Sequence, residues 1–265
     1  MELGIALYSL RRAIQSGAIR TVDVPAVCAD KLGLRRIDPT YPLLPIAHAP
    51  VRRQFKANAD AAGVVITTVA VAGEGDLSAS DPALRKQAVD NHRKWFDYAA
   101  EFGAAAFRAD TGGEGLQHDP DAIKRCTESF ATLAEWARQT GIEVMIENHG
   151  GISGNPDAVV QIIQQLGEHV RTVPDFGNFP DEIRYDGLRK MMPYAIAVHA
   201  KVHGFEPDGT HPRYDLARCI EIIRSAGYTG GVSIEFEGPT GGQDEPANEL
   251  EGVLIARDAL RKLGV

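Results

Sequence analysis

Residues 142–149 read Ile-Glu-Val-Met-Ile-Glu-Asn-His. The strand-like run within this stretch ends at Glu147, whose side chain is able to bind a metal ion. Three later strand-like runs end in the same way: Thr-Val-Pro-Asp at Asp175, Ile-Ala-Val-His at His199 and Val-Ser-Ile-Glu at Glu235. The four residues are 28, 24 and 36 positions apart, about the length of one strand, one helix and two loops. The spacing predicts that each lies at the same point of a βα unit.

The same alternation of strand-like and helix-like segments extends over all 265 residues. We expect strands near residues 3–8, 32–37, 64–71, 104–108, 142–147, 171–175, 195–201 and 231–236. Most of these runs are rich in Val, Ile and Ala without strict alternation, which is typical of strands covered on both faces. The length is close to the roughly 250 residues of a typical (β/α)8 barrel. The sequence therefore predicts an α/β protein, a single (β/α)8 TIM barrel in which residues 1–265 form one domain.

Helix boundaries are marked by proline and glycine. Each of three predicted helices begins with a capping side chain followed by proline, at Asp81-Pro82, Asp119-Pro120 and Asn155-Pro156. Periodic stretches end at glycines expected to turn through a left-handed conformation: Gly103, Gly141, Gly167 and Gly227. These signals predict that the strands are joined by helices, as a barrel requires.

Composition excludes several classes of protein. A net charge of -8 without a basic patch disfavours binding to nucleic acid, and no apolar run approaches the roughly 20 residues of a membrane helix. No signal peptide is evident at the start of the sequence, so we expect a cytoplasmic protein. Three widely spaced cysteines predict buried, reduced thiols rather than a disulfide framework.

In a barrel the carboxyl ends of all strands face one mouth, so the four metal-capable side chains would share a cavity there. Three carboxylates that share one cavity with a histidine repel each other unless a cation lies among them. The donors are mostly oxygen, without thiolate, and so favour Mn²⁺, with Mg²⁺ or Co²⁺ as alternatives, over a closed tetrahedral zinc site.

The motifs resemble those of the xylose-isomerase-like barrel superfamily, the sugar phosphate isomerase/epimerase group. The resemblance is carried by Glu147-Asn-His149, Asp175-Phe-Gly-Asn178, Val198-His199-Ala-Lys201 and Gly227-Tyr-Thr-Gly-Gly-Val-Ser-Ile-Glu235. It implies a metal ion held by Glu147, Asp175, His199 and Glu235, with the two glutamates also acting as acid and base.

The sequence departs from the ketose 3-epimerases of that superfamily at two substrate positions. Those enzymes carry a histidine three residues after the aspartate ligand and an arginine six residues after the histidine ligand, where this chain has Asn178 and Phe205. Asn178 can donate a hydrogen bond to a hydroxyl or carbonyl group but cannot titrate.

Five further residues near the predicted strand ends are candidates for substrate binding: His149, Asn178, Lys201, Arg108 and His203. His149 could instead support Glu147 or pack in its loop, and Lys201 could be a solvated strand end. His203 shares the face of His199 by strand alternation and is its rival as the metal ligand.

The chemistry predicted for this set is removal of a proton next to a carbonyl through an enediolate. We therefore predict a metal-dependent isomerase or epimerase of a sugar or keto-polyol. The alternative enzyme is a lyase or dehydratase acting on a keto-sugar, keto-inositol or dehydroshikimate-like substrate at the same site. An endonuclease IV-like enzyme is disfavoured by the acidic charge, and a non-catalytic sugar-binding barrel by the paired glutamates. The sequence does not decide whether the protein forms a homo-oligomer.

Overall fold

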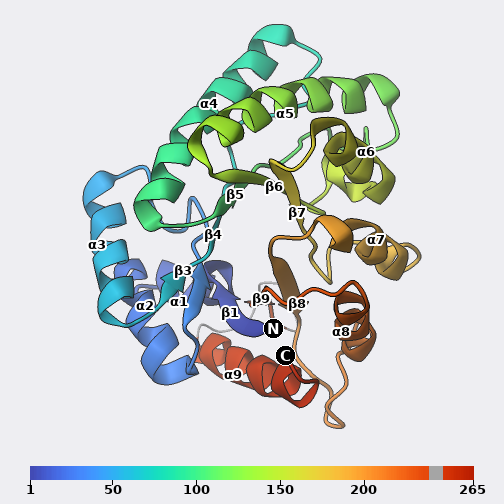
Figure 1. Cartoon of the computed structure of the whole chain (residues 1–265). Helices are drawn as coiled ribbons and strands as arrows, with labels where there is room; N and C mark the ends of the chain where they lie inside the picture. The colour runs from blue at the N-terminus through green and yellow to red at the C-terminus, as the bar shows by residue number, and fades with distance from the viewer. Residues whose placement is uncertain (239–246) are drawn as a thin grey trace. The chain divides into compact units, whose positions relative to one another are not determined.

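The computed structural model describes residues 1–238 and 247–265, together with the side chains of all of these except residues 247 and 248. The described chain forms two compact units, residues 1–67 with 197–265 and residues 68–196. Figure 1 shows both ends of the chain in the first unit, with β1 in blue and α9 in red. No helix among the described residues is long and apolar enough to cross a membrane.

The first unit is built on a parallel five-stranded sheet with the order β3-β2-β1-β9-β8. Its strands are β1 (Glu2–Ala6), β2 (Arg36–Asp38), β3 (Val65–Ile66), β8 (Val198–Val202) and β9 (Gly231–Phe236). Its α-helices are α1 (Arg11–Gln15), α2 (Val24–Val27), α3 (Ala49–Ala61), α8 (Leu216–Ser225) and α9 (Ala247–Lys262). Short 3₁₀ turns η1 (Leu7–Leu10) and η2 (Thr21–Asp23) and a π-helical turn η3 (Cys28–Leu32) lie between them.

The second unit is built on a parallel four-stranded sheet with the order β4-β5-β6-β7. Its strands are β4 (Thr68–Ala70), β5 (Ala106–Arg108), β6 (Glu143–Glu147) and β7 (Val170–Val173). Its α-helices are α4 (Pro82–Phe102), α5 (Pro120–Thr140), α6 (Pro156–Leu166) and α7 (Arg184–Met191), with 3₁₀ turns η4 (Gly151–Gly154) and η5 (Met192–Tyr194). The alternation of strand and helix predicted from the sequence is confirmed in each unit.

The predicted helix caps are confirmed. The side chains of Asp81, Asp119 and Asn155 each accept a hydrogen bond from a backbone N–H in the first turn of the helix that follows. Gly103 and Gly141 adopt the left-handed conformation at the ends of α4 and α5. Gly167 has a positive φ but an extended ψ of -157°, so it ends α6 in a different conformation from the one predicted.

Several strand predictions were wrong in detail. The run 3–8 is a strand only as far as Ala6, where η1 follows, and the run 195–201 becomes β8 only from Val198. The run 32–37 begins as part of η3, because a π-helical turn continues to Leu32 and reverses at Gly33, and β2 starts only at Arg36. The run 64–71 is two short strands, β3 and β4, which belong to different sheets. β7 ends at Val173, before the proline that precedes Asp175.

Each unit has its own apolar core between its sheet and helices. In the second unit, Phe107 of β5 packs edge-on against Phe96 of α4, with ring centroids 4.9 Å apart, and Phe130 of α5 is also fully buried. In the first unit, Ile5 of β1 and Phe55 of α3 are fully buried. This packing holds the helices of each unit against its sheet, and the sheets carry the candidate site residues.

Candidate metal centre and active site

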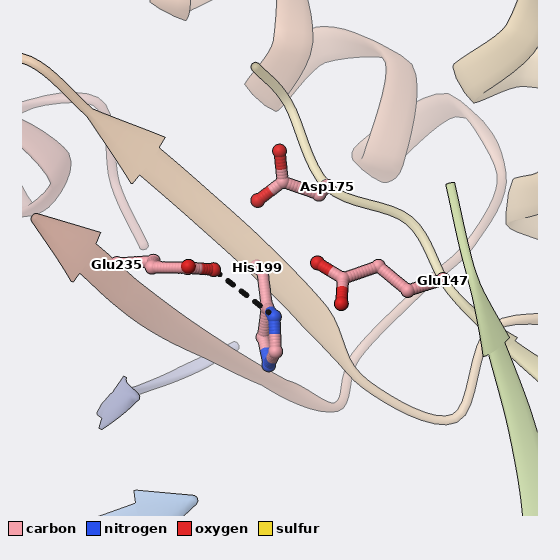
Figure 2. A group of neighbouring side chains, drawn as sticks. All are labelled: Glu147, Asp175, His199 and Glu235. Atoms are coloured by element: carbon pink, nitrogen blue, oxygen red, sulfur yellow. Dashed lines mark ion pairs between the residues drawn. The ribbon is translucent and has the colours of Figure 1, made fainter. Parts of the chain in front are cut away.

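The second unit carries two of the predicted metal ligands, Glu147 and Asp175 (Figure 2). Glu147 is the last residue of β6, and Asp175 lies two residues beyond the end of β7. Both are buried, and a carboxylate oxygen of one lies within 4.8 Å of a carboxylate oxygen of the other. Two carboxylates this close and shielded from water repel each other unless positive charge lies nearby. The pair therefore has the composition expected for part of a cation site.

Asp175 is held in place by Asn148, the residue next to Glu147. The Asn148 side chain accepts a hydrogen bond from the backbone N–H of Asp175 at 2.7 Å and donates one to its backbone carbonyl at 3.0 Å. Oδ1 of Asp175 accepts hydrogen bonds from the backbone N–H groups of Gly177 and Asn178, at 2.8 and 2.9 Å. The backbone position of Asp175 is thus tied to the end of β6. The sequence reasoning did not assign Asn148, although its place between two candidates was a signal.

Two of the predicted substrate contacts lie against Glu147. Arg108, at the end of β5, forms an ion pair with Oε2 of Glu147, and its Nε lies 3.3 Å from Oδ1 of Asp110. Asn178 donates a hydrogen bond from its side chain to Oε1 of Glu147 at 3.4 Å. Glu147 is therefore oriented by a positive charge on one oxygen and an amide on the other. Arg108 and Asn178 remain predicted substrate contacts.

His149 lies at a more exposed position of the second unit. Its side chain is 48% exposed, and its Nδ1 lies 3.6 Å from Oδ1 of Asp110. Its backbone N–H donates to the hydroxyl oxygen of Ser153 at 3.0 Å. His149 remains a predicted substrate contact, and Asp110 is a neighbour that the sequence reasoning missed.

The first unit carries the other two predicted ligands, His199 of β8 and Glu235 of β9. Nδ1 of His199 lies 3.4 Å from Oε2 of Glu235, the ion pair drawn as a dashed line in Figure 2. Both residues are at least nine-tenths buried. The register of the two strands places His199 opposite Ser233 and Lys201 opposite Glu235, so the side chains of His199 and Lys201 both approach Glu235.

Lys201 lies between two carboxylates at the ends of these strands. Its Nζ is 3.4 Å from Oε1 of Glu235 and 2.8 Å from Oε1 of Glu237, and Oε2 of Glu237 is 3.4 Å from Nε2 of His203. Burial raises the pKa of Glu237, but the contact with His203 and the charge of Lys201 outweigh it and bring that pKa to about 2. Glu237 is therefore an anion held by two basic side chains. The structure places His203 against Glu237 rather than Glu235.

The end of β9 is fixed by the chain segment that follows β1. The Ser9 hydroxyl donates to the carbonyl of Ile234 at 2.9 Å and accepts from the N–H of Phe236 at 2.8 Å. The guanidinium group of Arg11 donates to the carbonyls of Phe236 and Glu237, at 3.0 and 2.9 Å. Because these bonds lie on both sides of Glu235, they position its backbone.

Glu249 of α9 holds the same N-terminal segment from the other side. It is fully buried, and its two carboxylate oxygens accept the backbone N–H groups of Arg12 and Ala13, at 3.1 and 2.9 Å. One of these oxygens also lies 3.1 Å from Nε of Arg12. A chain of contacts thus runs from α9 through residues 9–13 to the end of β9.

The donor set fits a divalent cation. The first unit supplies one carboxylate and one imidazole, and the second unit supplies two carboxylates. Glu147 ends β6, Asp175 lies two residues beyond β7, and Glu235 is the last residue but one of β9. His199 is the second residue of β8, because that strand begins only at Val198, so the prediction that His199 ends its strand was wrong. Hard oxygen donors with one nitrogen donor suit Mn²⁺ or Mg²⁺. In the second unit Arg108 offsets part of the negative charge of Glu147 and Asp175, and a bound cation would offset the rest. A cavity of about 1200 Å³ in the first unit is lined by residues 204–211 and α9, among others, and by none of the four candidates.

Comparison with known proteins gives the family. The model of the family described as xylose isomerase-like TIM barrel matches residues 28–263. No curated protein matches. Among solved structures, D-psicose 3-epimerase with D-tagatose from Clostridium cellulolyticum H10 is 19% identical with a TM-score of 0.76, over 99% of this chain and 98% of that one.

Two metal-containing structures have the same fold. The IOLI protein with a bound zinc atom is 13% identical with a TM-score of 0.78, over 99% of this chain and 98% of that one. A xylose isomerase-like TIM barrel protein from Mycobacterium smegmatis, in complex with magnesium, is 19% identical with a TM-score of 0.67, over 100% of this chain and 98% of that one. At these identities the structures show the fold alone. The family model, which covers most of the chain, shows that the protein belongs to the xylose isomerase-like TIM barrel family.

Proposed function

We propose that the protein is a divalent-metal-dependent isomerase or epimerase of a sugar or keto-polyol. The observation that carries the proposal is the pairing, in each unit, of a buried glutamate at a strand end with a second metal-capable side chain: Glu147 with Asp175, and Glu235 with His199. We further propose that residues 1–265 form one barrel domain in which the two pairs make a single four-ligand site. Family membership supports this step, because a TIM barrel gathers its strand ends at one mouth.

The proposed cation is Mn²⁺, with Mg²⁺ or Co²⁺ as alternatives, held by Glu147, Asp175, His199 and Glu235. The oxygen-rich donor set supports this choice, as does the relative in complex with magnesium, while the relative with zinc makes zinc the competing ion. When bound, such an ion supplies Lewis acidity that stabilises negative charge developing on a substrate carbonyl oxygen.

The protein's own residues perform the proton transfers in this proposal. Glu147 and Glu235 come from different sheets, so one can remove a proton from the carbon next to the carbonyl while the other returns a proton. Lys201, already placed between two carboxylates, donates a hydrogen bond to a substrate oxygen that gains charge. The remaining candidates would bind substrate hydroxyl groups: His149, Asn178, Arg108 and His203.

A small sugar or polyol is the proposed substrate. The relative from C. cellulolyticum, whose structure contains D-tagatose, supports a sugar, and the net charge of -8 argues against a nucleic acid. The isomeric outcome is proposed because each glutamate has its own set of partners. Arg108 and Asn178 orient Glu147, whereas Lys201 and His199 contact Glu235.

One observation favours the alternative, a lyase acting on a keto-sugar or related substrate. Phe205 stands where ketose 3-epimerases carry a substrate-binding arginine, and its ring packs edge-on toward His211, with centroids 6.2 Å apart. The side chain of Phe205 carries no positive charge with which to bind a ketose hydroxyl group. A substrate lacking that group, or one that loses it, would suit the site better.

The test is a panel of keto-sugars and keto-polyols incubated with the Mn²⁺-loaded protein in deuterated water and analysed by mass spectrometry. An isomerase or epimerase gives products that differ from the substrate only by exchanged deuterium and reaches the same mixture from either side. Loss of water or of an aglycone, without an isomeric product, would establish the lyase instead.

Two variants assign the proton transfers. Glu147→Gln and Glu235→Gln should each lower turnover by at least about a hundredfold, because an amide cannot accept a proton. The matched control is Glu143→Gln, which makes the same change at the opposite end of β6 and should leave turnover unchanged. Normal turnover in either of the first two variants would remove the role assigned to that residue.

Metal dependence has its own measurement. Elemental analysis of the purified protein should find about one divalent ion per chain, and chelation should abolish activity that Mn²⁺ then restores. Activity that survives complete chelation would refute the metal-dependent mechanism, whatever the substrate.

A further inference from the structure

Asp38, a carboxylate outside the predicted ligand set, lies buried within the first unit. It is the last residue of β2, paired in register with Ala6 of β1, and it is only 1% exposed, less than Glu235 at 8%. Removing an ionised carboxylate from water costs several kcal/mol unless its oxygens are hydrogen-bonded and its charge is compensated. The residues that contact the Asp38 carboxylate should therefore indicate its role.

Three side chains of the same unit approach it. The Thr67 hydroxyl donates to Oδ1, the Ser233 side chain forms a hydrogen bond with the carboxylate, and Nε2 of His199 lies 3.7 Å from Oδ2. Hydroxyl groups satisfy lone pairs but carry no charge. Of these three side chains, His199 is the one whose ring can carry positive charge.

The contacts of His199 distinguish its two ring nitrogens. Nδ1 faces Glu235, a candidate metal ligand, whereas Nε2 faces Asp38. A metal-bound histidine coordinates through one nitrogen, and the group that accepts the N–H of the other nitrogen sets both the tautomer and the orientation of the ring. Asp38 occupies the place of that second group.

The two oxygens of Asp38 meet different neighbours. Oδ1 accepts the hydrogen bond from the Thr67 hydroxyl, whereas Oδ2 faces the imidazole of His199. A carboxylate oxygen directed at a ring nitrogen is a strong acceptor for an imidazole N–H.

We propose that Asp38 is a positioning residue for the metal site, accepting the Nε2 hydrogen of His199 so that Nδ1 presents its lone pair to the cation. The proposal rests on the proposed metal site but not on the identity of the substrate. Thr67 and Ser233 in turn orient Asp38.

The experiment measures Mn²⁺ affinity of the metal-free full-length chain by isothermal titration calorimetry. Asp38→Asn keeps the shape but loses the charge, and Asp38→Ala loses both, so we expect about tenfold and up to about a hundredfold weaker Mn²⁺ binding respectively. The matched control is Asp30→Asn, the same change at an exposed residue of the same unit, which should leave the affinity unaltered.

A double-variant cycle separates positioning from general stability. His199→Ala keeps the three carboxylates, so the weak Mn²⁺ affinity that remains after the metal is lost on purification can be titrated at high Mn²⁺ concentration. If Asp38 acts through His199, adding Asp38→Ala should lower that remaining affinity no further, whereas a merely structural role would lower the affinity in both backgrounds. Wild-type affinity in Asp38→Asn and Asp38→Ala, or equal losses in both backgrounds, overturns the proposal.

A spectroscopic measurement on the wild-type protein needs no Asp38 variant, so it can be made even if the Asp38 variants fail to fold. In the Mn²⁺-free protein loaded with diamagnetic Mg²⁺, ¹⁵N chemical shifts should show Nε2 of His199 protonated and Nδ1 bound. The opposite tautomer overturns the proposal.

Failure of the wild type to bind any divalent ion would overturn both this proposal and the metal mechanism. Metal binding that depends on Asp38, in a protein inactive on every keto-sugar, would leave Asp38 assigned and refute only the proposed function.

Discussion

Replacing Glu249 by alanine should strongly destabilise the protein although the residue lies outside the predicted site. Its carboxylate accepts two backbone N–H groups, from Arg12 and Ala13, and forms an ion pair with Arg12. Each buried N–H left without a partner costs about 1–3 kcal/mol, and breaking a buried ion pair costs about 3–5 kcal/mol. Because these contacts share one carboxylate their energies do not simply add, and we expect a loss of about 4 kcal/mol of unfolding free energy.

The assay is urea denaturation followed by circular dichroism, carried out in a chelator so that bound metal does not add to the apparent stability. The midpoint of thermal unfolding should fall by about 8–16 °C, at about 2–4 °C per kcal/mol for a chain of roughly this size. Glu249→Gln, which keeps one oxygen acceptor, should lose less than Glu249→Ala.

The matched control is Glu251→Ala, the same substitution at an exposed position of the same helix. It should change the unfolding free energy by no more than about 0.5 kcal/mol. The reasoning is refuted if Glu249→Ala loses less than about 1 kcal/mol or behaves like the control, since the buried contacts would then not contribute as the geometry requires.

Three further predictions concern the thiols, a buried carboxylate and the choice of histidine ligand. Burial raises the pKa of Cys28 to about 12, and all three cysteines are buried, so the folded protein should not react with a thiol reagent at pH 8, while the urea-unfolded chain should react fully. Burial also raises the pKa of Glu143, so its ionisation destabilises the folded state above about pH 4.5. Glu143→Gln should therefore be more stable than the wild type at pH 7 in urea denaturation, a gain that disappears below pH 4.5. His199→Ala should lose bound metal in elemental analysis, whereas His203→Ala should retain it and raise KM; the reverse pattern of metal content would exchange their roles.

The sequence predicted those parts of the fold that depend on local signals. Asp81, Asp119 and Asn155 were recognised as caps because the capping bond joins residues two or three positions apart. The start of β2 was misplaced because η3 depends on how Cys28 and Leu32 pack, which no local pattern near Lys31 indicates.

The candidate site shows the same division. Glu147 and Glu235 were identifiable because each ends a strand-like run. Asn148 and Asp38 were not assigned, because their partners, Asp175 and His199, lie 27 and 161 positions further along the chain and no local pattern pairs them. Residues that hold the candidate ligands in place are therefore harder to predict from the sequence than the ligands themselves.

The order of strands in the first unit has a consequence for how the protein is made. β1 is paired on one side with β2 and on the other with β9, whose last residue is Phe236. At about 5–20 residues per second, β1 leaves the ribosome between about ten seconds and a minute before its second partner does. During that interval residues 68–196, which are contiguous, can complete their own sheet. The nascent chain therefore exposes an unpaired edge of β1 until late in synthesis, and the pairing of His199 with Glu235 in the first unit forms last.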